Sequence, residues 1–562
     1  MKLPIAPYKE EKVKKYTIGF RGLNRTPNVI EGELTSMKNI SAKYLPCLTP
    51  RPSRQVIATL TSGNALFASP TKLCWIDVGD GYCATGKDAP ASAVRSTSQL
   101  YNGKIYCPES DGTAIHIYDI TDDSWTIGHI APASAKRYTS QLYNGKIYCP
   151  ENNGTAMHIY NIADDSWTIG HVAPASAKRY TSQLYDGKIY CPEHLGIKMH
   201  IYIISVVYFI YDGVVKGTVT AGSKSMCVFN NKIIIMPDKK YYDFITDTFG
   251  TIGTGVYPAS GSCPDIDYIC EYNNRLWGVK GNSIYASKLG DYSDWTTFLG
   301  LETDAYATDV ATPGSFTGIY PYANHVVMTK PDCLHELYGY KPSNFTIQKT
   351  TDKGCIYGKT IVEINGVLYF EGRDGIYAYT GSIPRPISAN LNETYNVASA
   401  GRFGNYYYLS LYNGTNYNLY IYDTFNGIWV REDDLNIKDF TLLDGALYAL
   451  GADNKIYKFD SGNETIDWEV ETEIFTEKIS EKKGHSQITL MIDLEQGSTL
   501  NIYYKINNGD YYLGRTFNNT GLQVVHTYMI PQRAEHFQIK LTGTGKFKLY
   551  EIERKFFYGS DV

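Results

Sequence analysis

Three nearly identical stretches decide the fold: QLYNGKIYCPE at residues 99–109, the same letters at 141–151, and QLYDGKIYCPE at 183–193. The spacing is 42 residues in both cases, and the surrounding residues repeat with the same period. A period in the forties, made of short alternating runs and turn dipeptides, is typical of one blade of a β-propeller. Residues 88–205 are therefore predicted to form three blade-like units.

Each unit contains four predicted strands, which in the first unit lie at 98–101, 104–107, 115–120 and 125–130. Asn102-Gly103 joins the first two as a type I′ hairpin turn, because both residues tolerate a positive φ. The polar residues 121–124 turn the chain before the fourth strand. The unit resembles the kelch repeat in its order of Ile-Tyr-Asp, polar turn, Trp, Arg and Asn-Gly-Lys-Ile-Tyr, with Cys-Pro-Glu in place of the usual Gly-Gly.

Weaker copies of the strand–turn–strand pattern continue to about residue 460. They occur at 229–236, 272–279, 364–370, 404–409 and 443–448. The strand-like runs 72–76 and 208–215, on either side of the perfect repeats, are interpreted as two halves of one blade. We therefore expect three recently duplicated units inserted into an older propeller of about seven blades, since propellers close with four to eight.

The predicted fold is all-β: a β-propeller of about seven diverged blades with inserted kelch-like 42-residue repeats and a C-terminal β-sandwich. Dense prolines indicate an extended arm at the N-terminus, and longer alternating strands indicate the sandwich. The expected boundaries are 1–54 for the arm, 55–87 and 206–461 for the propeller, 88–205 for the inserted repeats and 462–562 for the sandwich.

Composition excludes several classes of function. The net charge of the 562 residues is only −5, so no global basic field is available to grip nucleic acid. The 11 cysteines are odd in number and form no CxxC pair, which predicts reduced thiols in a protein that folds in a cytosol. No run approaches the ~18 apolar residues of a membrane helix, and residues 1–15 lack the apolar core of a secretory signal. We expect no membrane anchor.

No catalytic residue or cofactor site is predicted, because the chain lacks a P-loop, a GxSxG and an HExxH. The repeats carry cysteines and histidines at matching places: Cys107, Cys149 and Cys191; His116, His158 and His200; and His129 and His171. These residues would form a periodic metal ring, or they are copies of core residues. Zinc ligands usually have short local spacing, so we predict no metal.

The repeated carboxylates also allow two interpretations. Asp122, Asp123, Asp164 and Asp165 would be calcium ligands or a glycosidase pair, or they hold turns, which is the usual role of Asp before a strand. The aromatic and arginine side chains of the repeats would line a sugar-binding face, or they make contacts between blades. This candidate ligand face comprises Trp125, Arg137, Tyr138, Trp167, Arg179 and Tyr180.

Both ends of the chain resemble the nozzle and packaged-DNA-stabilisation proteins of tailed bacteriophages, which lie below the portal and adaptor. The N-terminal similarity rests on Gly-Leu-Asn at 22–24, Glu-Gly-Glu-Leu at 31–34, Met-Lys-Asn-Ile-Ser at 37–41 and residues 48–51. The C-terminal similarity rests on 530–533, 536–540, 543–545 and 558–561. The inserted repeats depart from this family pattern.

The resemblance implies a non-enzymatic virion protein that is folded in the bacterial cytoplasm. It would form a homo-oligomeric ring, often sixfold in that family, contact other tail and portal-adaptor proteins, and let DNA pass without sequence-specific binding. Head-to-tail contacts between subunits can close such rings. The alternative function is a binding protein whose inserted repeats recognise a host-surface glycan. An enzyme of the kelch-propeller type, such as a copper oxidase or a glycosidase, is the least favoured, because no convergent catalytic set is found.

Overall fold

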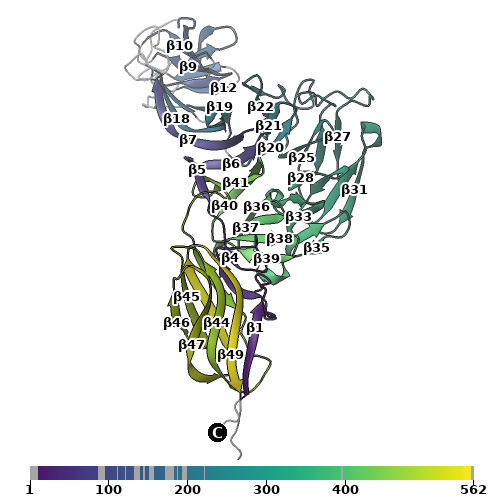
Figure 1. Ribbon diagram of the computed structural model, residues 1–562. Helices are drawn as coiled ribbons and strands as arrows, with labels where there is room; N and C mark the ends of the chain where they lie inside the picture. Colours follow the sequence, from purple (N-terminus) through teal and green to yellow (C-terminus); the bar gives the residue numbers. More distant parts are fainter. Residues whose placement is uncertain are drawn as a thin grey trace, which may run out of the picture. The chain divides into compact units, whose positions relative to one another are not determined.

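The regular structure of the chain is antiparallel β-sheet (Figure 1). The computed structural model describes residues 11–85, 95, 97–109, 112–120, 122–131, 140–143, 146–150, 157–170, 183–185, 188–192, 199–220, 222–393 and 397–558. Over these residues the only helical segments are three short 3₁₀ turns, Pro342–Asn344, Gly358–Thr360 and Ala389–Leu391. None of the described helices has the length and apolar character needed to span a membrane. The predicted all-β class is confirmed.

The chain divides into two compact units. The first comprises Met1–Asp77, Phe209–Gly217 and Gly222–Val562, and the second comprises Val78–Tyr208 and Thr218–Ala221. Two long strands, β7 (Leu73–Thr85) and β18 (Met199–Tyr211), contribute residues to both units. Each unit is described separately below.

The first unit contains six four-stranded sheets, five of which are each built from strands that follow one another in sequence. The first three are β20 (Ser225–Phe229), β21 (Lys232–Met236), β22 (Lys240–Asp243) and β23 (Thr248–Thr251); β24 (Tyr268–Tyr272), β25 (Arg275–Lys280), β26 (Ser283–Ala286) and β27 (Tyr306–Asp309); and β28 (Gly318–Tyr322), β29 (His325–Thr329), β30 (Leu334–Tyr338) and β31 (Thr346–Thr351).

The next two sheets are β32 (Val362–Ile364), β33 (Val367–Gly372), β34 (Gly375–Tyr379) and β35 (Arg385–Pro386); and β36 (Val397–Phe403), β37 (Tyr406–Tyr412), β38 (Tyr417–Asp423) and β39 (Ile428–Arg431). The last contains β40 (Ile437–Leu443), β41 (Ala446–Gly451) and β42 (Lys455–Lys458), and its fourth strand is β5 (Gln55–Thr59) from the N-terminal region.

A further sheet of this unit holds β6 (Gly63–Ala68), the start of β7, the end of β18 and β19 (Val214–Val219). The amide of Asp212, just after β18, donates to the carbonyl oxygen of Leu73 in β7 at 3.0 Å. The two runs interpreted as halves of one blade, 72–76 and 208–215, therefore lie in one sheet. The three inserted units occupy the connection between them.

Each of these sheets packs against the next one along the chain. At each successive boundary, buried residues of both sheets belong to one hydrophobic cluster or ring contact: Ile234 and Ile269, Val279 and Met328, Val327 and Phe370, Tyr369 and Tyr407, and Leu419 and Leu447. The sheet of β40–β42 then packs on that of β6 and β7 through Leu450 and Leu66. Phe209 of β18 contacts Tyr242 of β22, with ring centroids 5.6 Å apart. The series of contacts thus returns to the first sheet.

The first two 42-residue repeats in the second unit each form a four-stranded sheet, and the third contributes strands to a six-stranded sheet. The first is β8 (Gln99–Tyr101), β9 (Lys104–Pro108), β10 (Ile115–Asp119) and β11 (Ser124–Ile127), and the second is β12 (Gln141–Tyr143), β13 (Lys146–Pro150), β14 (Met157–Asn161) and β15 (Ser166–Gly170). The third repeat supplies β16 (Gln183–Tyr185) and β17 (Lys188–Pro192), which pair onto β18 in the sheet that also holds β7, β6 and β19.

The predicted hairpin turn of the repeats is confirmed in the first unit. Asn102 has φ 48° and Gly103 has φ 74°, as a type I′ turn requires, and Tyr101 pairs with Lys104 across it. The same turn recurs in the diverged sheets at Asn365-Gly366 and Asp444-Gly445, where all four residues have positive φ.

The C-terminal region forms two sheets that face each other (Figure 1). One sheet has the order β1-β49-β44-β47, with bounds Glu11–Ile18, Phe547–Tyr558, Lys483–Leu494 and Gly521–Ala534. The other has the order β2-β43-β48-β45-β46, with bounds Leu34–Lys38, Asp467–Thr472, Phe537–Thr544, Thr499–Ile506 and Tyr511–Phe517. The short strands β3 (Ile40–Ser41) and β4 (Thr49–Pro50) pair beside them.

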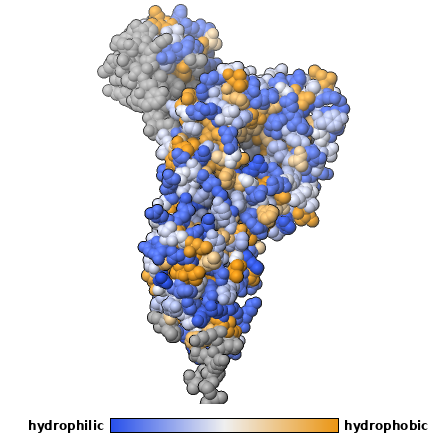
Figure 2. Space-filling model, viewed as in Figure 1, coloured by the Kyte–Doolittle hydropathy of each residue, from blue (hydrophilic) through white to orange (hydrophobic). Residues whose placement is uncertain are grey.

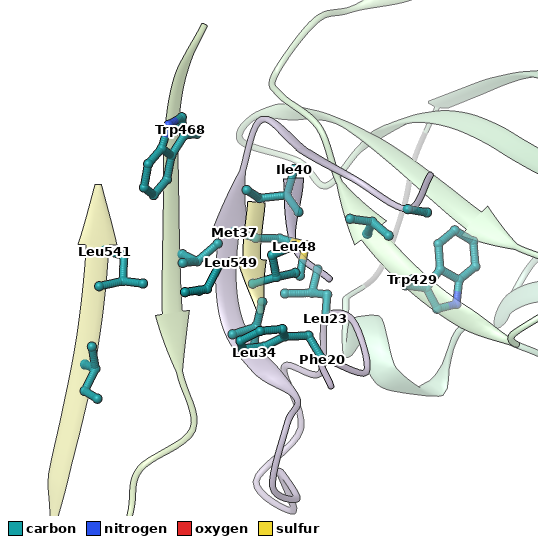
Figure 3. Packing of buried hydrophobic residues seen from close by; sticks show 14 of the residues in the cluster. Phe20, Leu23, Leu34, Met37, Ile40, Leu48, Trp429, Trp468, Leu541 and Leu549 are labelled. Carbon is teal, nitrogen blue, oxygen red and sulfur yellow. The ribbon is translucent and has the colours of Figure 1, made fainter. Parts of the chain in front are cut away.

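The N-terminal segment corrects one expectation. Residues 1–54 were expected to form an extended arm, but β1 pairs with β49 and β2 pairs with β43, so the described part of the segment belongs to both C-terminal sheets. Figure 3 shows side chains of this segment between Trp429 of β39 and Leu541 of β48. The prolines do not prevent this packing, because none lies within β1 or β2.

Candidate functional site

The two tryptophans of the predicted ligand face each pack on a tyrosine ring of their own repeat, and Trp167 also bonds to the preceding repeat. Trp167 is buried, and its Nε1 donates to the carbonyl oxygen of His129 at 2.8 Å. Trp125 is half-buried, and its ring lies 5.1 Å from that of Tyr118. The other members of the face, Arg137, Tyr138, Arg179 and Tyr180, lie outside the described residues.

The arginine of the first repeat, Arg95, was missed by the sequence analysis, although it lies one period before Arg137. Its guanidinium is 5.3 Å from the Trp125 ring, and its Nη2 donates to His116 Nδ1 at 3.2 Å. His116 Nε2 in turn lies 3.0 Å from Glu109 Oε1. Burial lowers the pKa of His116, although the bond to Glu109 raises it. Arg95 is only 2% exposed, so its guanidinium stabilises the interior of the first repeat.

The repeated carboxylates accept hydrogen bonds from tyrosines. Tyr118 donates to Asp123 and Tyr160 donates to Asp165, five residues along in each case, and both aspartates have positive φ. A diverged sheet of the first unit has the same contact, from Tyr242 to Asp247 at 2.7 Å. In the part of the chain that the structure describes, no group of three or more His, Cys, Asp or Glu side chains is placed to hold a metal ion.

The first unit contains two neighbouring cavities where the first strands of its sheets begin. One measures about 340 Å³ and the other about 420 Å³, and both are lined by Ser223, Tyr268, Gly358 and Lys359. Their walls include the starts of β20, β24, β28, β36 and β40 and the turn Gly358–Thr360 before β32. Both volumes fall within the ~300–1,000 Å³ of small-molecule sites.

The 420 Å³ cavity, which we name the lysine cavity, has an unusual charge balance. Lys359 and Lys438 line it, and none of its lining residues is an aspartate or glutamate. Tyr268, Tyr357 and Tyr417 add three phenol groups to the wall. Burial raises the pKa of Tyr268 and of Tyr357, so both phenols stay protonated near neutral pH.

Carboxylates lie behind or beside the lysines. Lys359 Nζ is 3.1 Å from Asp439 Oδ2, and Lys224 in the wall of the smaller cavity pairs with the buried Asp238. Lys438 Nζ bonds only to neutral oxygens among the described residues, the Gly63 carbonyl at 3.0 Å and Asn454 Oδ1 at 3.2 Å. The lysine cavity is therefore rich in hydrogen-bond donors and positively charged.

No family model matches the chain, and no curated protein matches it. Three solved structures are similar to it at low identity. PorZ, a bacterial surface component of the type-IX secretion system of Porphyromonas gingivalis, is 11% identical, with TM-score 0.32 over 88% of this chain and 82% of that chain. A chain of the mitotic checkpoint complex is 12% identical, with TM-score 0.21 over 51% and 88%. A Bacteroides fragilis protein assigned as exported is 11% identical, with TM-score 0.29 over 41% and 79%. Scores this low carry no argument about function.

Proposed function

We propose that the seven sheets of the first unit form a seven-bladed β-propeller. Two observations support this. Successive sheets pack in a series that returns to its start through Leu66 with Leu450 and Phe209 with Tyr242. The first strands of six sheets begin around the two cavities, and Lys438 bonds to Gly63, where the first strand of the seventh sheet begins. Strand β5, supplied by the N-terminal region, completes the last blade in this scheme.

We further propose that the protein is a non-enzymatic structural component of a tailed-bacteriophage tail, of the nozzle type. The observation that carries this proposal concerns the residues on which the family resemblance rests. The N-terminal residues of that set form one joint between the N-terminal segment, the sheet β36–β39 and the C-terminal sandwich. A motif that builds such a joint has a structural reason to recur in proteins with this domain order.

The contacts of the joint are specific to the motif residues. The amide of Leu23 donates to the carbonyl oxygen of Trp429 at 2.7 Å, and Asn39 Nδ2 donates to that of Asp467 at 2.6 Å. Arg51 Nε donates to Asn39 Oδ1 at 2.8 Å. Gly22 has φ 86°, and a Cβ there would lie 2.5 Å from the Trp429 oxygen, so only glycine fits. The motif thus serves packing of the joint.

In this role the protein would assemble as a homo-oligomeric ring below the portal-adaptor, sixfold as in the proteins it resembles, and would conduct DNA without binding its sequence. Exposed apolar side chains are available for contacts between copies. On β46 and β47 they are Tyr512, Leu513, Leu522, Val524 and Tyr528. Figure 2 shows hydrophobic residues among the hydrophilic ones on the sandwich. Exposed apolar groups on edge strands favour association.

Native mass spectrometry and negative-stain imaging of the full-length protein test this proposal. We expect closed rings, formed by the protein alone or after mixing with the other tail proteins. Val524→Asp on β47 should weaken the ring, whereas Val256→Asp, at another exposed valine of the first unit, is the matched control. A monomer at every concentration and with every tail protein, especially one that binds glycans on an array, would contradict the structural role and favour the adhesin.

A further inference from the structure

We propose that the lysine cavity binds a small hydroxylated ligand that carries an oxyanion, either a carboxylate as in a sugar acid or a phosphate. This site is separate from the ligand face predicted on the repeats. It also does not depend on the proposed tail function, because it rests on the walls of the cavity alone.

The two ammonium groups have hydrogen-bonding capacity left over. A lysine ammonium has three N–H donors. Lys438 uses two of them, toward Gly63 and Asn454, and Lys359 uses two, toward Asp439 Oδ2 at 3.1 Å and the Lys438 carbonyl oxygen at 3.5 Å. Each lysine therefore keeps one donor for a group in the cavity.

The charge of the cavity favours an anion. Asp439 neutralises Lys359, but Lys438 has only uncharged partners among the described residues, so about one positive charge is unbalanced. Both side chains are half-buried, which weakens screening by water. A charge-assisted bond from an ammonium to a carboxylate or phosphate oxygen is stronger than a neutral one.

The phenols supply the selectivity for a hydroxylated ligand. In the described part of the chain, no protein group is hydrogen-bonded to the hydroxyl of Tyr268, Tyr357 or Tyr417. Each hydroxyl can donate one bond and accept others. Together with the Asn436 side chain in the same wall, they present a set of groups that matches several ligand hydroxyls around one charged oxygen.

Calorimetric titration of the full-length protein tests the site with D-glucuronate, inorganic phosphate and D-glucose. We expect glucuronate or phosphate to bind, and glucose, which lacks the charge, to bind at least about tenfold more weakly. Tighter binding of glucuronate would identify a carboxylate ligand, and tighter binding of phosphate a phosphorylated one. Absence of binding by both anions would overturn the proposal.

Variants then locate the binding. Lys438→Met should weaken it about ten- to a hundredfold, because one charge-assisted bond is lost. Lys455→Met is the matched control, since Lys455 lies on β42 of the same sheet and outside the cavity. Because Lys438→Met also removes bonds to Gly63 and Asn454, Tyr417→Phe provides a second variant that loses no described protein bond. Binding that is unchanged in both variants would overturn the proposal.

Discussion

At the scale of single residues, Arg54 is a buried cation that lies between two carboxylates. Arg54 forms ion pairs with Glu432 and with Asp433, the latter at 2.6 Å. The side chains of Arg54 and Glu432 are only 5% and 1% exposed. Burial raises the pKa of Glu432, and Arg54 opposes that shift. Arg54 precedes β5, so this contact holds the strand that completes the last sheet.

We expect Arg54→Met to lower the free energy of unfolding by about 3–5 kcal/mol, because it leaves a buried carboxylate without its partner. Urea unfolding followed by circular dichroism measures this. Lys43→Met is the control, since its pair with Asp460 is largely exposed and worth at most about 1 kcal/mol. Equal losses in the two variants would show that burial of the Arg54 pair is unimportant.

Glu371 makes stability depend on pH. Burial raises the pKa of its carboxyl from 4.5 to about 8, and Oε2 has no hydrogen-bond partner among the described residues. The folded state therefore holds a proton that the unfolded state releases above about pH 4.5, so stability falls as pH rises from there to about 8. Glu371→Gln should remove this pH-dependent loss of folding stability, which is of the order of a few kcal/mol. Melting temperatures from pH 5 to 8 should fall less steeply in the variant, and parallel profiles would contradict the assignment.

Some of the important single residues could be predicted from the sequence, and others could not. The 42-residue period identified the arginines Arg137 and Arg179, and it equally points to Arg95, which the structure shows buried against Trp125. No comparable signal marks Lys438 or Tyr417. Their shared cavity is lined by residues from Ser223 to Lys438, which come together only when the sheets pack, so this candidate site could not be predicted from the sequence.

At the scale of single elements, a tyrosine on the third strand of several sheets closes the following turn. Tyr242 of β22 donates to Asp247 Oδ1 at 2.7 Å, as Tyr118 and Tyr160 do to their aspartates in the repeats. In β38 the equivalent Tyr422 precedes Gly427, which offers no side-chain acceptor. The turn of that sheet relies on glycine, with φ 70°, instead of the hydrogen bond.

This difference supplies a matched pair of variants. Tyr242→Phe should lower the free energy of unfolding by about 1 kcal/mol, because it removes one hydrogen bond to a carboxylate that remains open to solvent. Tyr422→Phe should change it by less than about 0.5 kcal/mol, since its hydroxyl has no partner among the described residues. Thermal unfolding of both variants tests this, and similar losses would indicate that packing of the ring dominates.

Local elements were more predictable than long-range pairing. The Asn-Gly hairpins, the alternating strands and the tyrosine-rich third strands follow from neighbouring residues, and the structure contains them. The pairing of β1 with β49 joins residues more than 500 positions apart, such as Tyr16 and Glu553. Nothing in the local pattern of residues 1–54 specifies that partner, which is why the segment was expected to be an extended arm.

At the scale of the whole molecule, the inserted repeats and the first unit should behave as separable parts. The middle repeat, residues 131–172, can be removed so that Ile130 is followed by Ala173-Pro174, which restores the native Ile-Ala-Pro sequence. None of the sheets of the first unit loses a strand in this deletion, because β12–β15 all belong to the second unit. We therefore expect the first unit to keep its melting transition in scanning calorimetry.

The matched control removes 42 residues from the first unit instead. Deleting residues 316–357 eliminates β28–β31, the sheet against which Val279 and Phe370 pack from either side. Because loss of this sheet exposes the apolar faces of both neighbouring sheets, this variant should aggregate. If instead the deletion of 131–172 aggregates to the same degree, the repeats would be part of the main ring of sheets, and their interpretation as an insertion would be wrong.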